Sequence, residues 1–274
     1  MTPANDQGEA RSALFSSRRH LARRYVENAV RPTLSPGNLA WRYSPRGIKN
    51  RARLAALRGR LHGQRCFILG NGPSLRDTDL ELLRDEWVIG LNRIYLHPAA
   101  AVWRRWLYCC VNPHVLQQFQ DEILRVDAPK FLPWEHRDTL GFARDRFWLR
   151  TRHEPRFSFD LTDAMWQGAT VTFVAMQVAF HLGFTDVVLV GVDHAFASQG
   201  QPNTLAQSHG DDTDHFAPDY FGPGVRWQLP DLVQSETAYR LAKQAFEQEG
   251  RRIRDATIGG RLEVFPKAHY KDLF

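Results

Sequence analysis

The sequence has few cysteines and no long apolar run. Its three cysteines, Cys66, Cys109 and Cys110, are odd in number and two are adjacent, so they form neither a disulfide framework nor a zinc-binding spacing. No apolar segment approaches the ~18–20 residues that cross a bilayer. The polar stretch from Thr2 to Ser12 contains no signal-peptide core. These absences predict a soluble, cytoplasmic protein with buried free thiols.

Acidic residues are scarce in the first part of the chain. Residues 1–65 hold 14 Lys/Arg and three Asp/Glu, whereas residues 66–274 hold 22 and 27. The net charge of +6 therefore arises from the N-terminal segment, and the rest of the chain is mildly acidic. A nucleic-acid-binding body would carry its own basic face, so nucleic acid is not an expected partner.

The N-terminal segment is predicted to be a basic extension over residues 1–64. A helix is expected at Leu14–Val30, with arginines on one face. That helix either packs on its own domain or lies on an anionic membrane through residues 11–31. The prolines and glycines from Pro32 to Gly47 predict a linker, and the basic stretch Lys49–Arg60 predicts a second short helix.

Residues 65–274 show apolar runs that do not alternate with polar residues. These runs predict strands at Arg65–Leu69, Trp87–Leu91, Trp106–Val111, Lys130–Pro133 and Asp186–Val192. The clearest helix is Val171–Leu182, which Gly183 is suited to end. Buried strands separated by helices predict an α/β, Rossmann-like domain with a parallel sheet covered on both faces.

Four further elements are expected in the same domain. They are a helix from Pro113 to about Arg125, a long loop at about 194–230, a helix at Glu236–Glu249, and final short strands at Ile253 and Leu262–Phe265.

Asparagine follows three of the predicted strands. Asn71, Asn92 and Asn112 stand where the strands end, and Asp193 follows a fourth. In an open α/β sheet this edge binds ligands. A carboxamide offers donors and an acceptor without charge, which suits the base, ribose and phosphate of a nucleotide. Asparagine also ends strands and enters turns well, but three together favour a site.

Two turns add possible anion-binding groups. The glycines of Gly70-Asn71-Gly72-Pro73-Ser74 would let the backbone approach a ligand, and Ser74 begins a pattern typical of a helix N-cap. An ordinary tight turn is the alternative, because neither a Walker nor a dinucleotide glycine pattern is complete. The turn Gly168-Ala169-Thr170 precedes the clearest helix, where Thr170 is a suitable N-cap whose free N–H groups would accept a second anionic group.

One acid–imidazole cluster comprises Asp211, Asp212, Asp214 and His215. Three interpretations remain open: Mg²⁺ ligands, a histidine general base oriented by a carboxylate, or a solvated acidic loop. His215 is the candidate base, and His194, next to Asp193, is its rival.

These residues resemble a known family. Gly70–Leu75, Leu91–Arg93, the Val171–Leu182 helix and Leu189–Asp193, in this order, resemble the 6-hydroxymethylpterin diphosphokinase MptE-like family and the related bacterial sialyltransferases that use a CMP-activated sugar. The tail from His215 onward looks like MptE-like bacterial proteins presumed to act in surface-polysaccharide synthesis.

The resemblance implies roles for these residues. Asn71, Asn92 and Asn112 would contact a CMP donor, as would the turn of Gly168, Ala169 and Thr170. The general-base histidine of the sialyltransferases lies in a Gly-His-Ser pattern that this sequence lacks, and His215 and His209 only lie in the comparable region. The archaeal pyrophosphokinases of the family use ATP and Mg²⁺, which would give Asp193 and the acidic loop a metal role.

Three hypotheses follow. The first is a transferase with a nucleotide-activated donor, at best a CMP-sugar-dependent glycosyltransferase of cell-surface glycan synthesis, with His215 and Asp193 as catalytic residues and a small molecule or glycan as acceptor. The second is an ATP- and Mg²⁺-dependent pyrophosphokinase acting on a pterin-like alcohol. The third is a non-catalytic nucleotide-binding protein.

Overall fold

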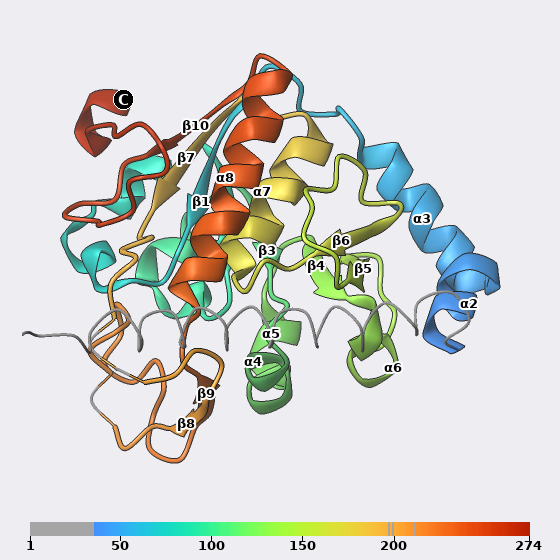
Figure 1. Ribbon diagram of the computed structural model, residues 1–274, viewed down its shortest axis with the longest axis horizontal. Coiled ribbons are helices and arrows are strands. Elements are labelled where there is room, and N and C mark those ends of the chain that lie inside the picture. Colours follow the sequence, from blue (N-terminus) through green and yellow to red (C-terminus); the bar gives the residue numbers. More distant parts are fainter. Residues whose placement is uncertain (1–35, 197, 199, 211) are drawn as a thin grey trace, which may run out of the picture. The chain divides into compact units, whose positions relative to one another are not determined.

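The structure is a computed structural model (Figure 1). It describes residues 36–274 apart from 197, 199 and 211. The helix predicted at Leu14–Val30 and the membrane contact predicted for residues 11–31 lie outside the described residues. No helix among the residues described is long and apolar enough to cross a bilayer.

The chain divides into two compact units, residues 1–48 and residues 49–274. The second unit begins before Arg65, where the sequence places the start of its Rossmann-like domain. The predicted buried free thiols are confirmed, since all three cysteines are buried and unpaired with one another. Burial raises the pKa of the Cys110 thiol to about 12, so this group stays protonated at neutral pH.

Two helices replace the linker predicted from Pro32 to Gly47. Helix α2 spans Pro36–Tyr43 and helix α3 spans Pro45–Leu57. Each begins with a proline, whose fixed φ suits the first helical position and whose missing N–H is not needed there. The Ser44 hydroxyl accepts a hydrogen bond from the Gly47 amide at 3.0 Å and so caps α3. The linker prediction is wrong over the described residues, because these prolines start helices.

Eight strands form one parallel sheet in the order β10-β7-β1-β2-β3-β4-β5-β6. The strands are β1 Arg65–Leu69, β2 Trp87–Leu91, β3 Arg105–Cys109, β4 Lys130–Pro133, β5 Arg146–Arg152, β6 Ala164–Trp166, β7 Asp186–Val190 and β10 Arg252–Asp255. The predicted α/β, Rossmann-like fold is confirmed.

Strands β3 and β7 end two residues earlier than predicted, at Cys109 and Val190 rather than at Val111 and Val192.

Other strands differ more from the prediction. Strands β5 and β6 were not expected. The apolar run of β5 is only three residues long among four polar ones, and β6 has only three residues in all. The strand expected at Leu262–Phe265 does not form, and only an isolated bridge joins Asp255 to Lys267 near it.

The connections create a switch in strand order beside β1. From β1 the chain adds β2 to β6 outward on one side, then returns to place β7 and β10 on the other side. Ligands of open α/β sheets bind at such a switch point, outside the carboxyl ends of the strands. A ligand is therefore expected at the turns that follow β1, β2 and β7.

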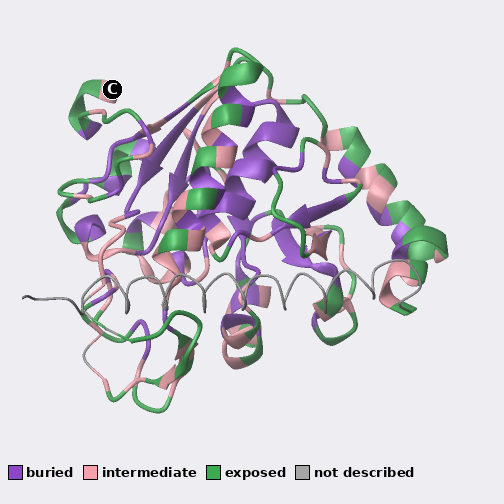
Figure 2. Cartoon of the chain, viewed as in Figure 1, coloured by how far each residue is buried: buried purple, intermediate pink, exposed green. Residues whose placement is uncertain are grey.

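Helices α7 and α8 lie together against the sheet (Figure 1). Helix α7 spans Val171–Leu182 as predicted and ends at Gly183, whose φ is +98°. It is buried from Thr172 onward, as expected for a helix in which nine of the twelve residues are apolar. Helix α8 spans Leu232–Gln248 and exposes its outer side (Figure 2).

The helix predicted at Lys49–Arg60 is present as part of α3, which begins earlier, at Pro45, and ends at Leu57.

Two further predicted helices have different bounds. Helix α8 begins before Glu236 because Asp231 caps it, accepting a hydrogen bond from the Gln234 amide at 2.9 Å. The helix predicted from Pro113 to Arg125 is broken at Phe119 into two short helices. They are α4 Pro113–Gln118 and α5 Gln120–Arg125; a further short helix, α6, spans Arg137–Leu140.

The predicted long loop at about 194–230 contains a small antiparallel hairpin. It is formed by β8 Leu205–Gln207 and β9 Arg226–Gln228. The Gln118 side chain bonds to both the amide and the carbonyl of Arg226, at 2.9 and 2.8 Å, and so ties β9 to α4. The segment thus crosses from β7 toward the helix that follows β3.

Candidate functional site

The turns after β1 and β7 pack directly on each other. Gly70 and Gly72 donate backbone hydrogen bonds to Val190 and Gly191, at 2.8 and 2.9 Å. A Cβ on Gly70 would overlap the Gly191 carbonyl, and one on Gly72 would overlap the Asp193 carboxylate. The two glycines are therefore required for close approach of the two turns.

The Asp193 side chain joins the turn after β7 to the turn after β1. Its carboxylate accepts hydrogen bonds from the Ser74 amide at 3.1 Å and the Ser74 hydroxyl at 2.8 Å. Burial raises the pKa of Asp193, and the bonds from Ser74 act in the opposite direction. The predicted N-cap at Ser74 is wrong, because a single 3₁₀ turn, Pro73–Asp77, begins one residue earlier and Ser74 lies inside it.

Two strand-end asparagines hold unpaired oxygens. The Asn71 amide group donates to the Leu91 carbonyl at 3.1 Å, which joins the ends of β1 and β2. Asn92 has a φ of +46°, a left-handed conformation that asparagine tolerates. The carboxamide oxygens of both residues are buried and have no hydrogen-bond partner among the residues described. Such acceptors are rare in native proteins and call for an explanation.

Asn112 is engaged differently. Its side-chain oxygen accepts from the His114 amide at 2.9 Å and the Val115 amide at 3.4 Å, as the N-cap of α4. Helix capping accounts for asparagine here. The structure thus brings Asn71 and Asn92 together on adjacent strands and gives Asn112 a separate structural bond.

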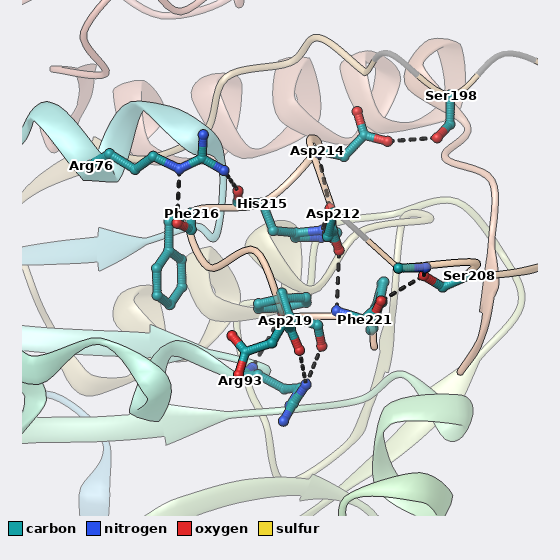
Figure 3. Close-up of polar contacts among 12 residues, drawn as sticks. Arg76, Arg93, Ser198, Ser208, Asp212, Asp214, His215, Phe216, Asp219 and Phe221 are labelled. Carbon is teal, nitrogen blue, oxygen red and sulfur yellow. Dashed lines mark hydrogen bonds and ion pairs between the residues drawn. The ribbon is translucent and has the colours of Figure 1, made fainter. Parts of the chain in front are cut away.

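Residues 212–221, here termed the strap, lie across the ends of β1 and β2. The Phe216 amide donates to the Asn71 carbonyl at 2.9 Å. The Arg76 guanidinium donates to the carbonyls of His215 and Phe216 at 2.6 and 2.9 Å (Figure 3). These bonds place the predicted base next to the turn that carries Asn71.

His215 and Asp212 form a partly buried pair in the strap (Figure 3). The His215 Nδ1 lies 2.8 and 2.9 Å from the two Asp212 carboxylate oxygens. Asp212 also accepts from the amides of Asp214 and Phe221, at 2.9 and 3.2 Å. Because a carboxylate accepts from Nδ1, a neutral imidazole held in this way carries its proton on Nδ1 and leaves Nε2 unprotonated.

An aromatic ring fixes the plane of this imidazole. The ring of His215 stacks on that of Tyr220, with centroids 3.9 Å apart and planes 4° apart. Burial raises the pKa of the Tyr220 hydroxyl, so Tyr220 stays neutral. The interpretation of the acidic loop as a carboxylate-oriented histidine is the one that this geometry supports.

The two described aspartates of the cluster, Asp212 and Asp214, are bound to protein groups. Asp211 lies outside the described residues, Asp212 is committed to His215, and Asp214 accepts from the Ser198 hydroxyl at 2.7 Å. Among the residues described, no three His, Cys, Asp or Glu side chains gather in a way that would hold a metal ion. We therefore assign no step to a metal.

The turn before α7 is constrained. Gly168 and Ala169 have φ values of +62° and +61°, and such a value is uncommon for alanine. Thr170 caps α7 by accepting from the Thr172 amide at 3.2 Å, and its hydroxyl lies 3.4 Å from that of Tyr239. The predicted cap is confirmed, and an anion at this turn stays a prediction.

The other candidate histidines do not take part in the Asp212–His215 pair. His194 Nε2 is 3.2 Å from Glu236, and His209 is exposed. A cavity of about 520 Å³ lies elsewhere, between α8 and the segment 261–264. Its lining consists mainly of charged side chains of both signs, and it contains none of the predicted nucleotide-binding residues.

Arg93 is a site residue that the sequence did not single out as a binding or positioning group, and it contacts Tyr220 of the strap. Arg93 follows Asn92 directly, and its guanidinium bonds to the strap at the Tyr220 carbonyl. The two residues are 127 positions apart in sequence, so no local spacing pattern links them. The only signal in the sequence was an arginine directly after a strand-end asparagine, and its burial is seen only in the structure.

Comparisons with protein-family models, with curated proteins and with solved structures found no match to this chain. The resemblance drawn from its motifs therefore stays a prediction.

Proposed function

We propose that the protein is a transferase that uses a nucleotide-activated donor, at best a CMP-sugar-dependent glycosyltransferase. One observation carries the proposal: the buried carboxamide oxygens of Asn71 and Asn92 have no partner among the described residues, and the strap with His215 crosses the same strand ends. A buried acceptor without a donor costs about 1–3 kcal/mol. The amino group of cytosine or a ribose hydroxyl would supply that donor. The further proposal that the product is a cell-surface glycan rests only on the resemblance of the sequence motifs.

In the proposed reaction His215 acts as general base. Its Nε2 takes the proton of the acceptor hydroxyl while the acceptor oxygen bonds to the anomeric carbon of the donor. The bond from that carbon to the phosphate oxygen breaks, and CMP leaves with the electron pair. Asp212 holds the required tautomer and stabilises the imidazolium that forms. Asp193 keeps the turn of Ser74 in place beside the donor.

The first test is thermal unfolding of the full chain with CMP, CDP, UDP, ADP and ATP, each with and without Mg²⁺. A ligand at about 100 times its dissociation constant stabilises by about 2.7 kcal/mol. Stabilisation by CMP without metal supports the proposal. Stabilisation by ATP with Mg²⁺ alone would favour a pyrophosphokinase, and CMP binding without transfer from any CMP-sugar would favour a non-catalytic protein. No shift with any nucleotide would refute the site.

Asn92→Gly tests the site directly. Glycine keeps the left-handed backbone without strain and removes the carboxamide, so the variant should fold and lose most of the CMP-induced shift. Asn203→Gly is the matched control, because Asn203 is an exposed asparagine with a φ of +64°. Equal CMP shifts in the two variants would contradict the role of Asn92.

A further inference from the structure

Arg93 is a buried cation that joins the strap to the sheet. Its side chain is 8% exposed. Its Nη1 donates to the carbonyl of Tyr220 and, at 3.4 Å, to that of Asp219, as Figure 3 shows. Its backbone amide donates to the Tyr220 hydroxyl at 3.3 Å. Tyr220 is therefore held by the same residue at both its backbone and the tip of its side chain.

The Arg93 guanidinium also contacts helix α5 and the residue before it. Arg93 Nη2 lies 3.1 Å from the Glu122 carboxylate, and the Tyr95 hydroxyl donates to the same oxygen at 2.9 Å. The guanidinium carbon lies 3.7 Å from the centroid of the Phe119 ring. A planar guanidinium reaches two carbonyls, a carboxylate and an aromatic face at once, which a lysine ammonium does not.

We infer that Arg93 is a positioning residue, which sets the place and plane of the His215 imidazole through Tyr220. The chain of contacts is short: Arg93 fixes Tyr220, and the Tyr220 ring stacks on His215 at 3.9 Å. Among the described residues, the hydrogen bonds and ring contacts of Arg93 go to Tyr220, Asp219, Glu122 and Phe119 rather than to His215. The catalytic meaning of this arrangement rests on the proposed function, whereas the arrangement itself is measurable without any nucleotide.

The test uses the full chain with labelled histidine. The two imidazole nitrogen shifts of His215, assigned by their loss in His215→Gln, report its tautomer. The wild-type protein should show one tautomer, with the proton on Nδ1. Arg93→Lys should give a mixture of tautomers and speed amide exchange in residues 212–221 by about 10-fold or more, since charged hydrogen bonds to the strap are lost. Arg104→Lys is the control, because Arg104 forms an exposed ion pair.

A second variant keeps the inference testable if Arg93→Lys does not fold. Glu122→Gln leaves Arg93 in place and removes the charge of its partner, so it should shift tautomer and exchange in the same direction by a smaller amount. The inference is overturned if these variants only lower the melting temperature and leave the His215 tautomer unchanged. Absence of nucleotide binding in the wild-type protein would instead refute the proposed function.

Discussion

Two histidines between β7 and α8, His194 and His215, each pair with a carboxylate. The two carboxylates differ in their exposure and in their other hydrogen-bond partners. Glu236, the partner of His194, is 37% exposed and also binds Arg240 at 2.6 Å. The bond from His194 lowers the pKa of Glu236. This carboxylate is shared between two cationic or donor groups at the surface, as in many structural ion pairs.

In the strap pair, the carboxylate of Asp212 is held by the backbone. Asp212 is 5% exposed, accepts from two backbone amides and binds His215 through both oxygens. His215 presents Nδ1 to this carboxylate, whereas His194 presents Nε2 to Glu236. A buried, backbone-fixed carboxylate orients an imidazole far better than a shared surface one. Under the proposed function, the comparison favours His215 as the general base and gives His194 a structural bond.

The largest effect should separate the two histidines. His215→Gln should lower kcat for transfer from a CMP-sugar by about 100-fold or more, because general-base catalysis contributes at least that much. His194→Gln, the matched control, should stay within roughly threefold of the wild type. Steady-state kinetics measure both, and a larger loss in His194→Gln would reverse the assignment.

A smaller difference should appear between the two carboxylates. Asp212→Asn presents an amide that can donate to Nδ1 and so favours the wrong tautomer, which should lower kcat by about 10- to 100-fold with little change in the KM for the donor. Glu236→Gln removes the corresponding partner of His194 and should leave kcat nearly unchanged. Similar kcat values for the two variants would show that the dedicated carboxylate has no special role.

The smallest effect concerns Asp193, which precedes His194. Its pKa is raised by burial, so the stability from this group is present below the unfolded pKa and lost as pH rises through the folded one. Asp193→Asn can still accept a bond from Ser74 and carries no charge. Its melting temperature relative to the wild type should therefore increase from about pH 4 to about pH 8. A difference that falls with pH would contradict the raised pKa.

Much of the fold was predictable because buried parallel strands are written as continuous apolar runs. Strand β7 and helix α7 with its Gly183 cap follow directly from such patterns. Strand β5 was missed because its polar residues hide it. Helix α2 was missed because proline is found both at the first position of helices and where helices end, so Pro36 alone does not tell the two apart.

The site was predictable in part, for a geometric reason. The carboxyl ends of parallel strands share one edge, so Asn71 and Asn92 had to be neighbours once the strands were recognised. The seating of the strap was not predictable, because it depends on Arg76 and Arg93 meeting residues more than 120 positions away. Asn112 shows the limit of the pattern, since its side chain caps a helix.

The central claim is that the edge formed by β1, β2 and the strap binds the donor nucleotide. Hydrogen–deuterium exchange of the full chain with and without CMP tests it most directly, because it locates binding in the sequence. Binding of CMP at this edge should slow exchange in residues 70–75, 91–96 and 212–221. Protection confined to α8 and residues 261–264, around the charged cavity, would contradict it.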